Sequence, residues 1–243
     1  MIPSLPLRSI RAVTRAQMIE VDRLMVEHYH ISLLQMMENA GLNLALLASW
    51  RFLAGNHVGK RVTILAGKGG NGGGALVCAR HLVNWGAEAS VVLTAPRSQL
   101  GEVPGHQFSI LKKIGVPDIQ ASDIHGLPET DLIIDGIIGT SLNGDPRPPA
   151  DNLIRLANDH PAPILALDIS TGLDADTGEI FDPAVMAEVT MTLALPKQGL
   201  LQVSAKPWVG DIYLADISVP TSLYNDLGVP SPIFHNGPII HLT

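Results

Sequence analysis

The chain has 243 residues and a formal net charge of −7, from 16 Lys and Arg against 23 Asp and Glu. Apolar residues make up 46% of the chain and charged residues only 16%, which favours a large aliphatic core and excludes intrinsic disorder. The acidic balance and the lack of a Lys/Arg cluster argue against nucleic acid or a membrane surface as a partner.

The cysteine content and the hydropathy of the chain exclude further classes of protein. The single Cys78 cannot form an internal disulfide, and with the nine histidines it shows no zinc-binding spacing. The start of the chain lacks the apolar centre of a signal peptide, and no stretch approaches roughly 18 uninterrupted apolar residues. We therefore expect a soluble, cytoplasmic protein with neither an export signal nor a membrane span.

Two helices are predicted within residues 1–55. Thr14 and Gln17 have the spacing of a capping box, and apolar residues recur at helical spacing after them. A second helical pattern begins at Ser32. We expect both helices to pack on an α/β core within a single domain that spans residues 1–243.

Strands and helices alternate in the rest of the chain. The predicted strands are 61–66, 89–94, 131–135 and 163–168, with weaker ones at 189–194 and 211–215. The predicted helices between them are 75–85, 106–114 and 152–158. Nearly continuous apolar strands separated by helices favour a mostly parallel sheet that is covered on both faces. The predicted fold is therefore a Rossmann-like, three-layer α/β/α sandwich. The strand 211–215 is a candidate for an edge of its sheet.

A glycine-rich segment, A-G-K-G-G-N-G-G-G-A at 66–75, follows the first of these strands and precedes a helix. Six glycines in ten residues let the backbone approach a ligand closely, and the helix N-terminus offers free amides to an anion. The segment is not a Walker A loop, because Lys68 is followed by Gly69 rather than by Ser or Thr. It favours a phosphate or pyrophosphate group as ligand, and a plain flexible turn is the alternative.

Two aspartates end predicted strands, Asp135 in D-L-I-I-D and Asp168 in I-L-A-L-D. Ligands of open parallel sheets bind beyond the carboxyl ends of the strands, where a carboxylate can bind a cation or move a proton. A capping or turn role explains a single Asp better, but two of them beside a glycine-rich helix start favour a site. Asp145 lies in a loop long enough to reach the same ligand, and Lys197 either contacts the ligand or ends a strand.

Seven segments occur in a recognisable order along the chain. They are M-M-E-N-A-G (36–41), G-K-G-G-N-G-G (67–73), L-V-C-A-R-H-L (76–82), D-G-I-I-G-T (135–140), D-I-S-T-G-L-D-A-D-T-G (168–178), P-K-Q-G-L (196–200) and G-D-I-Y-L-A-D-I (210–217). In this order they resemble the motifs of the NAD(P)H-hydrate epimerase family, also called the YjeF N-terminal domain. The resemblance runs through almost the whole chain.

The resemblance implies an isomerase of nicotinamide nucleotide repair. Members of the family interconvert the R and S forms of hydrated NADH and NADPH, so that a stereospecific dehydratase can restore the cofactor. The hydroxyl-bearing ring carbon can lose hydroxide to an iminium-like state and regain it on the other face, which needs a general acid. Because no kinase-like domain follows, we expect the dehydratase to be a separate protein. Surplus apolar surface on the first two helices favours a homodimer.

The resemblance also assigns roles residue by residue. It implies Asp135 and Asp168 as catalytic residues, and Asn71, Asp135 and Thr171 as oxygen ligands of a potassium ion. The implied substrate-binding residues are Lys68, Gly69, Gly70, Asn71, Gly72, Gly73, Gly74, Gly139, Thr140, Ser141, Leu142, Asn143, Gly144, Asp145 and Asp168.

Several positions depart from the family pattern. Where the family has N-N-G-G-D-G this chain has G-N-G-G-G-A, so Gly70 replaces the first Asn, Gly74 the acidic residue and Ala75 the last Gly. Lys68 stands where the family usually has Pro, and D-I-P-S-G has become D-I-S-T-G, in which Thr171 keeps a hydroxyl. The missing carboxylate at Gly74 leaves two alternatives open: an isomerase acting on another nucleotide-like ligand, and a non-catalytic protein that binds a nucleotide.

Overall fold

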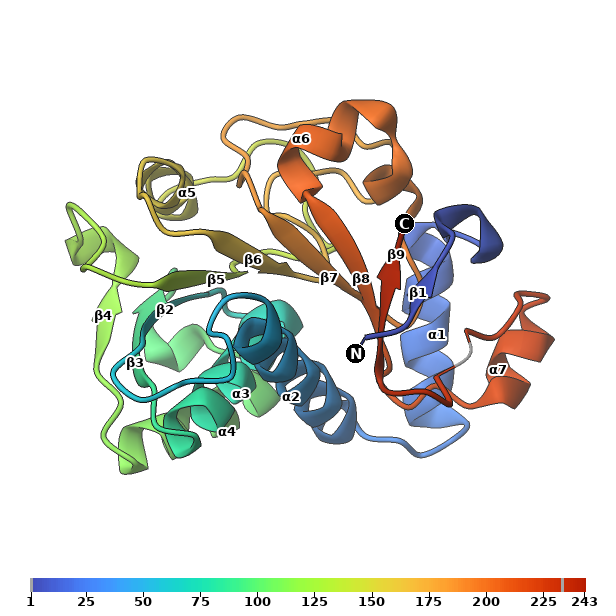
Figure 1. The fold of residues 1–243 in the computed structure, drawn as a ribbon, viewed down its shortest axis with the longest axis horizontal. Helices are drawn as coiled ribbons and strands as arrows, with labels where there is room; N and C mark the ends of the chain where they lie inside the picture. Colours follow the sequence, from blue (N-terminus) through green and yellow to red (C-terminus); the bar gives the residue numbers. More distant parts are fainter. Residues whose placement is uncertain (1, 233) are drawn as a thin grey trace.

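A mostly parallel sheet forms the centre of the molecule (Figure 1). The computed structural model describes residues 2–232 and 234–243, and within them nine strands lie in the order β1-β9-β8-β7-β6-β5-β2-β3-β4. Among these strand pairs β8 and β9 alone run antiparallel. The strands are β1 (Ser4–Leu5), β2 (Arg61–Ala66), β3 (Glu88–Leu93), β4 (Asp118–Gln120), β5 (Leu132–Gly136), β6 (Ile164–Leu167), β7 (Val189–Leu193), β8 (Asp211–Ala215) and β9 (Ile239–Leu242).

Helices cover both faces of this sheet and complete three layers. The helices are α1 (Arg15–Glu27), α2 (Leu33–Arg51), α3 (Gly70–Asn84), α4 (Glu102–Lys113), α5 (Ala150–Asn158), α6 (Lys206–Val209) and α7 (Thr221–Asp226). Short 3-10 helices span Leu7–Ser9, Arg97–Gln99, Ala121–Asp123, Gln198–Leu201 and Val203–Ala205. One aliphatic core joins α2, α3 and α4 to one face, a second joins α5 to the other face, and a third joins α1 and α7 to β8 and β9.

The expected α/β/α sandwich is confirmed, and so are the starts of the first two helices. Thr14 and Gln17 form the capping box that begins α1, each side chain bonding to the other residue's backbone. Ser32 and Gln35 do the same at the start of α2. These short-range hydrogen bonds satisfy amides that have no partner inside the helix, which is why the local sequence alone locates both helix starts.

Other boundaries differ from the prediction. Helix α3 begins at Gly70 rather than at residue 75, and α4 begins at Glu102 rather than at residue 106. Strand β8 does not lie at an edge, because β9, which was not predicted, pairs with it on its free side. The short strand β1 then pairs with β9 and ends the sheet.

Glycines allow α2, α3 and the sheet to approach closely. A Cβ atom on Gly41 of α2 would overlap the side chain of Val77 on α3, and one on Gly72 would overlap the carbonyl of Gly67. A Cβ atom on Gly136, at the end of β5, would overlap the side chain of Ala75. The glycines of the first turns of α3 are therefore helical residues in a tight interface.

The register of the central strands brings their carboxyl ends together. Asp135 on β5 lies opposite Leu65 of β2 and Ala166 of β6, and Asp168 comes one residue after β6 ends. The loops after β2, β5 and β6 consequently meet at one edge of the sheet. This is the edge at which parallel α/β sheets bind their ligands.

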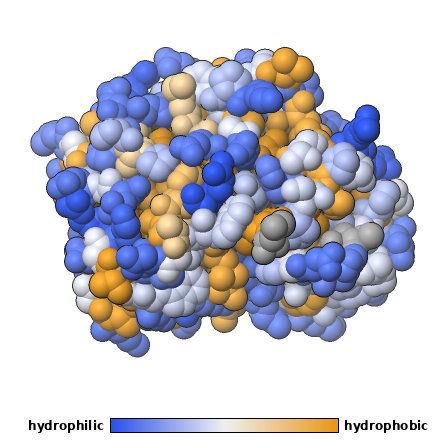
Figure 2. Space-filling model, in the orientation of Figure 1, coloured by the Kyte–Doolittle hydropathy of each residue, from blue (hydrophilic) through white to orange (hydrophobic). Residues whose placement is uncertain are grey.

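The surface is mainly polar on the side seen in Figure 1. A space-filling view from the same side shows hydrophilic residues over most of this face, with apolar residues in separate small patches (Figure 2). Among the described residues, none of the helices combines the length and the apolar character needed to cross a membrane.

Candidate active site

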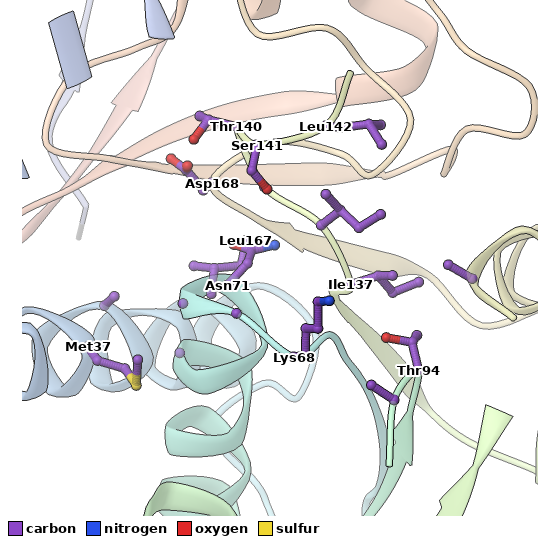
Figure 3. A pocket seen from close by; sticks show the side chains of 18 of the residues that line it. Met37, Lys68, Asn71, Thr94, Ile137, Thr140, Ser141, Leu142, Leu167 and Asp168 are labelled. Atoms are coloured by element: carbon purple, nitrogen blue, oxygen red, sulfur yellow. The ribbon is translucent and has the colours of Figure 1, made fainter. Parts of the chain in front are cut away.

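A cavity of about 880 Å³ opens at this edge, between α2, the start of α3 and the loops after β2, β5 and β6. In Figure 3, Asp168 and Thr140 lie toward one end, Thr94 lies toward the other, and Asn71 and Lys68 lie between them. The predicted substrate-binding residues that line the cavity are Lys68, Gly69, Gly70, Asn71, Gly74, Gly139, Thr140, Ser141, Leu142, Asn143, Asp145 and Asp168. Most of the predicted site is therefore brought together in space.

Three predicted substrate-binding glycines are not among the lining residues. Gly72 packs against the backbone of Gly67, and a Cβ atom on Gly73 would lie 2.5 Å from the side chain of Met37. Gly144 has a φ of +87°, a left-handed conformation that favours glycine, so it shapes the turn of its loop. These glycines hold the shape of the cavity wall, and direct contact with a substrate stays a prediction for them.

Asp135 and Thr171 lie beneath the cavity and not on its surface. Asp135 is completely buried, and its Oδ1 accepts hydrogen bonds from the Thr171 hydroxyl (2.7 Å) and the Ile137 amide (3.1 Å). Its Oδ2 accepts one from the Thr171 amide (2.8 Å). Burial raises the pKa of Asp135 to about 6, while the hydrogen bonds from Thr171 and Ile137 pull it down. Asp135 does not reach the cavity surface, so a catalytic effect of this residue would have to be transmitted by the residues that lie between it and the cavity.

Asn71 carries an unpaired polar atom next to this buried carboxylate network. Its Nδ2 is buried without a hydrogen-bond partner among the described residues, and a Cβ atom on Gly139 would lie 3.3 Å from its Oδ1. The neighbouring Ile138 donates its amide to the Thr171 hydroxyl (3.0 Å), and its carbonyl lies 3.0 Å from the same hydroxyl. The oxygen and the nitrogen of a side-chain amide are assigned from their hydrogen bonds. If the Asn71 amide is turned by half a rotation, its oxygen takes the position of the unpaired nitrogen.

Asp168 is held at the opposite wall by a buried lysine. Lys197 is 1% exposed, and its ammonium forms a close ion pair with Asp168 Oδ1. The same ammonium donates to the Leu193 carbonyl (2.9 Å) and to the Thr192 hydroxyl (3.3 Å). Asp168 itself has a φ of +66° in this position. Lys197 does not end a strand, because β7 ends at Leu193, and it is not among the residues that line the cavity; it fixes a carboxylate that does.

A carboxylate from α1 lines the same cavity and was not predicted. Asp22 is one turn beyond Met18 and next to Val21 on the apolar stripe of α1, yet its side chain is open to the cavity. Surrounding protein atoms and the negative charge of Asp168 raise the pKa of Asp22 to about 6, against the opposing effect of Lys197. A charged residue within an apolar helical stripe is the sequence signal that could have found it.

The other end of the cavity suits an anion. Helix α3 begins at Gly70 with no side chain capping its N-terminus, so its first amides are free to bind an anionic group. Lys68 precedes this helix start, and Arg147 is a second cation among the lining residues. Arg147 was also missed, because a single Arg in a proline-rich loop carries no recognisable signal.

The loop 139–145 is fastened to the body of the protein at two points. Arg15, the first residue of α1, donates from Nη2 to the Leu142 carbonyl (2.6 Å) and pairs with Asp174 (3.2 Å). Asp145 accepts a hydrogen bond from the Asp182 amide (3.0 Å). The position of the loop therefore depends on α1, which lies far from it in sequence.

Metal-binding clusters of the usual kind are lacking in the described part of the chain. No group of three or more His, Cys, Asp and Glu side chains there could hold a metal ion. The oxygen atoms around Asp135 are a different kind of donor set, with one carboxylate and several neutral oxygens.

The fold and this cavity define a Rossmann-like α/β protein with a ligand site at the carboxyl edge of its sheet. The chain belongs to the family described as YjeF-related protein N-terminus, whose model matches residues 33–199. The resemblance found in the sequence motifs is thereby confirmed.

Curated relatives and a solved structure agree with this family. The chain is 39% identical over 242 residues to an NAD(P)H-hydrate epimerase of Dehalogenimonas lykanthroporepellens, covering 97% of this chain and 94% of that protein. It is 32% identical to an NAD(P)H-hydrate epimerase of Rhodopirellula baltica, covering 92% and 91%. The bifunctional NAD(P)H-hydrate repair enzyme Nnr of Moorella thermoacetica is 36% identical, and the match covers 87% of this chain but 41% of that enzyme. The crystal structure of yeast ynu0 matches with a TM-score of 0.81 and 28% identity, covering 96% of this chain and all of that one.

Replacing Arg15 by Met should loosen the loop 139–145. A hydrogen bond from a charged donor contributes about 1.5–3 kcal/mol, so amide hydrogen exchange in this loop should become about 10-fold faster or more. Exchange monitored by mass spectrometry tests this. Arg23→Met is the matched control, because Arg23 lies on the same helix and pairs with exposed Glu20 and Glu27. Equal loop exchange in the two variants would contradict the anchoring role.

Proposed function

We propose that this protein is an NAD(P)H-hydrate epimerase, an isomerase that interconverts the R and S forms of hydrated NADH and NADPH in nicotinamide nucleotide repair. The observation that carries the proposal is its 39% identity, over almost its full length, to an NAD(P)H-hydrate epimerase. The cavity supports it, because an anion-binding helix start and a fixed carboxylate lie in one space of about 880 Å³.

The two ends of the cavity suit the two parts of such a dinucleotide. The pyrophosphate fits at the N-terminus of α3, where free amides and the charge of Lys68 favour an anion. The hydrated nicotinamide ring fits toward Asp168, where Leu167 supplies apolar wall (Figure 3). This orientation brings the reacting carbon next to the carboxylate and keeps the phosphates away from it.

Epimerisation requires a bond from ring carbon to hydroxyl to break and form again on the other face. As the hydroxyl leaves with a proton, the ring nitrogen shares its lone pair with the carbon and the ring becomes an iminium cation. We propose that Asp168, which pairs with Lys197 and lines the cavity, stabilises this positive charge. Water then adds to the opposite face and releases its proton.

We also propose a potassium site beneath the cavity floor, held by Asn71, Asp135 and Thr171. The unpaired Asn71 amide, the Thr171 hydroxyl and the Ile138 carbonyl bring neutral oxygens to a single carboxylate. Such a set suits a monovalent hard cation. A potassium ion there would supply a positive charge near the substrate, and Asp135 would act as its ligand instead of transferring protons.

The alternative functions depend on Gly74. This residue lines the cavity, and a Cβ atom on it would lie 2.8 Å from Cδ2 of Leu167. The carboxylate that relatives are expected to carry at this position would thus meet Leu167 here. The glycine in place of this carboxylate favours a second candidate function. The protein would then either act on another nucleotide-like substrate or bind a nucleotide without catalysis.

The bifunctional NAD(P)H-hydrate repair enzyme of Moorella thermoacetica matches this chain over 41% of its own length. We propose that a dehydratase is the pathway partner that acts on the epimer this protein forms. The one cysteine, Cys78, is buried and free, which agrees with a reducing cytoplasm.

Purified protein should accelerate the conversion of one enriched epimer of hydrated NADPH into the other, above the spontaneous rate. Asp168→Asn should lower kcat about 100-fold or more, because the iminium cation loses its stabilising charge. Chromatographic separation of the epimers measures both rates, and Asp123→Asn, an exposed aspartate far from the cavity, is the control.

Two outcomes would favour the alternatives. A protein that shows a thermal shift with the nucleotide hydrate but leaves the epimer ratio at its spontaneous rate is a binding protein. A thermal shift with another phosphate compound and none with the hydrate indicates a different substrate.

Potassium should stabilise the protein in the absence of substrate. At ten times its dissociation constant, a bound ion adds about 1.4 kcal/mol, or roughly 2–4 °C in thermal midpoint. Melting curves in potassium chloride and in choline chloride of equal ionic strength test this. Asp135→Asn should abolish the difference, while Asp123→Asn should keep it. Equal midpoints of the wild-type protein in the two salts would refute the ion site.

We further propose a homodimer through α2. Leu46 and Trp50 lie one turn apart on this helix and are 39% and 50% exposed. Sedimentation should give about twice the 25.9 kDa of one chain, and the double variant Leu46→Glu, Trp50→Glu should sediment as a monomer. A wild-type protein that sediments as a monomer at micromolar concentration would disprove the dimer.

A further inference from the structure

The ion pair between Lys197 and Asp168 leaves no proton free for transfer. The three protons of the Lys197 ammonium have three acceptors, namely Asp168, the Leu193 carbonyl and the Thr192 hydroxyl. Because the lysine is 1% exposed, water cannot readily replace them. Lys197 therefore holds Asp168 in a buried ion pair in which each ammonium proton has an acceptor.

Asp168 is also fixed in orientation. Its Oδ1 accepts the Leu193 amide (3.2 Å) in addition to the ammonium of Lys197. A carboxylate with this many donors on one oxygen is well suited to stabilise a nearby cation and poorly suited to carry a proton. The reaction still needs a group that gives a proton to the leaving hydroxyl and accepts one from the entering water.

Asp22 has the properties that this group needs. It lines the same cavity as Asp168, it comes from a different element, and no described residue forms an ion pair or hydrogen bond with its carboxyl group. Asp22 is an exposed residue that opens onto the cavity, and partial loss of solvation there raises its pKa to about 6, with Lys197 lowering the pKa and Asp168 raising it. The ammonium of Lys197 is paired with Asp168 and not with Asp22, so of the two carboxyl groups that line the cavity Asp22 is the one without a partner.

Charged groups of the sheet loops and of α1 itself surround Asp22. From the sheet and its loops they are Asp168 and Lys197. On its own helix, Arg23 is directed to the outer surface by its pairs with Glu20 and Glu27.

We propose that Asp22 is a further catalytic residue, the general acid and base that exchanges a proton with the hydroxyl of the hydrated ring while Asp168 remains an anion. This assignment rests on the epimerase function proposed above. It lies outside the segment matched by the family model, because that match begins at residue 33.

The proton balance closes on Asp22. Its carboxyl proton moves to the hydroxyl as the bond from carbon to oxygen breaks, and the electron pair of that bond leaves with water. The ring nitrogen supplies the electrons for the new double bond to carbon. Water then attacks the other face, its oxygen lone pair forms the new bond, and its surplus proton returns to the Asp22 carboxylate.

Asp22→Asn tests the role, with the conversion of one epimer measured from pH 5 to 8.5 and corrected for the spontaneous reaction. General acid and base catalysis contributes about 10²–10⁴ in rate, so kcat should fall at least about 100-fold while KM changes less than about 3-fold. Wild-type kcat should decrease as the pH rises through about 6, because Asp22 must begin protonated, and the variant should lose this pH dependence. Asp22→Glu should restore part of the activity, and Glu27→Gln, on the exposed side of the same helix, should behave as wild type.

The outcomes separate this assignment from the function on which it rests. A wild-type protein that does not accelerate epimerisation refutes both. An active wild type whose Asp22→Asn variant keeps its rate and pH profile refutes the assignment alone and leaves the epimerase standing. Loss of activity that comes with a lower thermal midpoint and is not recovered in Asp22→Glu also refutes it, since that pattern indicates a structural role.

Discussion

The close approach of backbones at the start of α3 is the constraint on which the site depends. A Cβ atom on Gly67 would overlap the carbonyl of Ile137, one on Gly72 would overlap the carbonyl of Gly67, and one on Gly136 would overlap Ala75. Three backbone segments, the loop after β2, the start of α3 and the end of β5, therefore meet with only the methyl group of Ala75 at the contact between α3 and β5. This contact places the uncapped N-terminus of α3 directly beside the loop after β5. Any larger residue at these positions would separate the anion-binding end of the cavity from its floor.

Two aspartates lie at the floor and at the wall of the cavity, Asp135 buried beneath it and Asp168 lining it. Asp135 is surrounded by donors from Thr171 and Ile137, and its burial leaves it poorly solvated, which fits a ligand for a cation. Asp168 is neutralised by Lys197 and still faces the cavity. A buried charge without a partner costs several kcal/mol, so both arrangements require that their partners be in place. The two strand-end aspartates therefore look alike in sequence and differ in their surroundings, because their partners differ.

Helix α1 contributes more to the site than its position before the first central strand suggests. It carries Asp22 to the cavity, and its first residue, Arg15, holds the Leu142 carbonyl of the loop 139–145. Both contacts join parts of the chain more than a hundred residues apart. The proposed acid and base group and the loop that would cover the ligand are thus coupled through one helix.

Local signals in the sequence determined the layered fold, the capping boxes at Thr14 and Ser32, and the aspartates at the ends of β5 and β6, because hydrophobic period and short-range hydrogen bonds are local properties. Family motifs supplied the site residues of the glycine loop and of the loop 139–145. Tertiary structure alone decided that the glycines continue into α3, that β9 covers β8, and that Asp22 and Asp168 line one cavity with Lys197 buried behind Asp168. These features arise from contacts between distant segments, whose spacing along the chain carries no trace of their proximity in space.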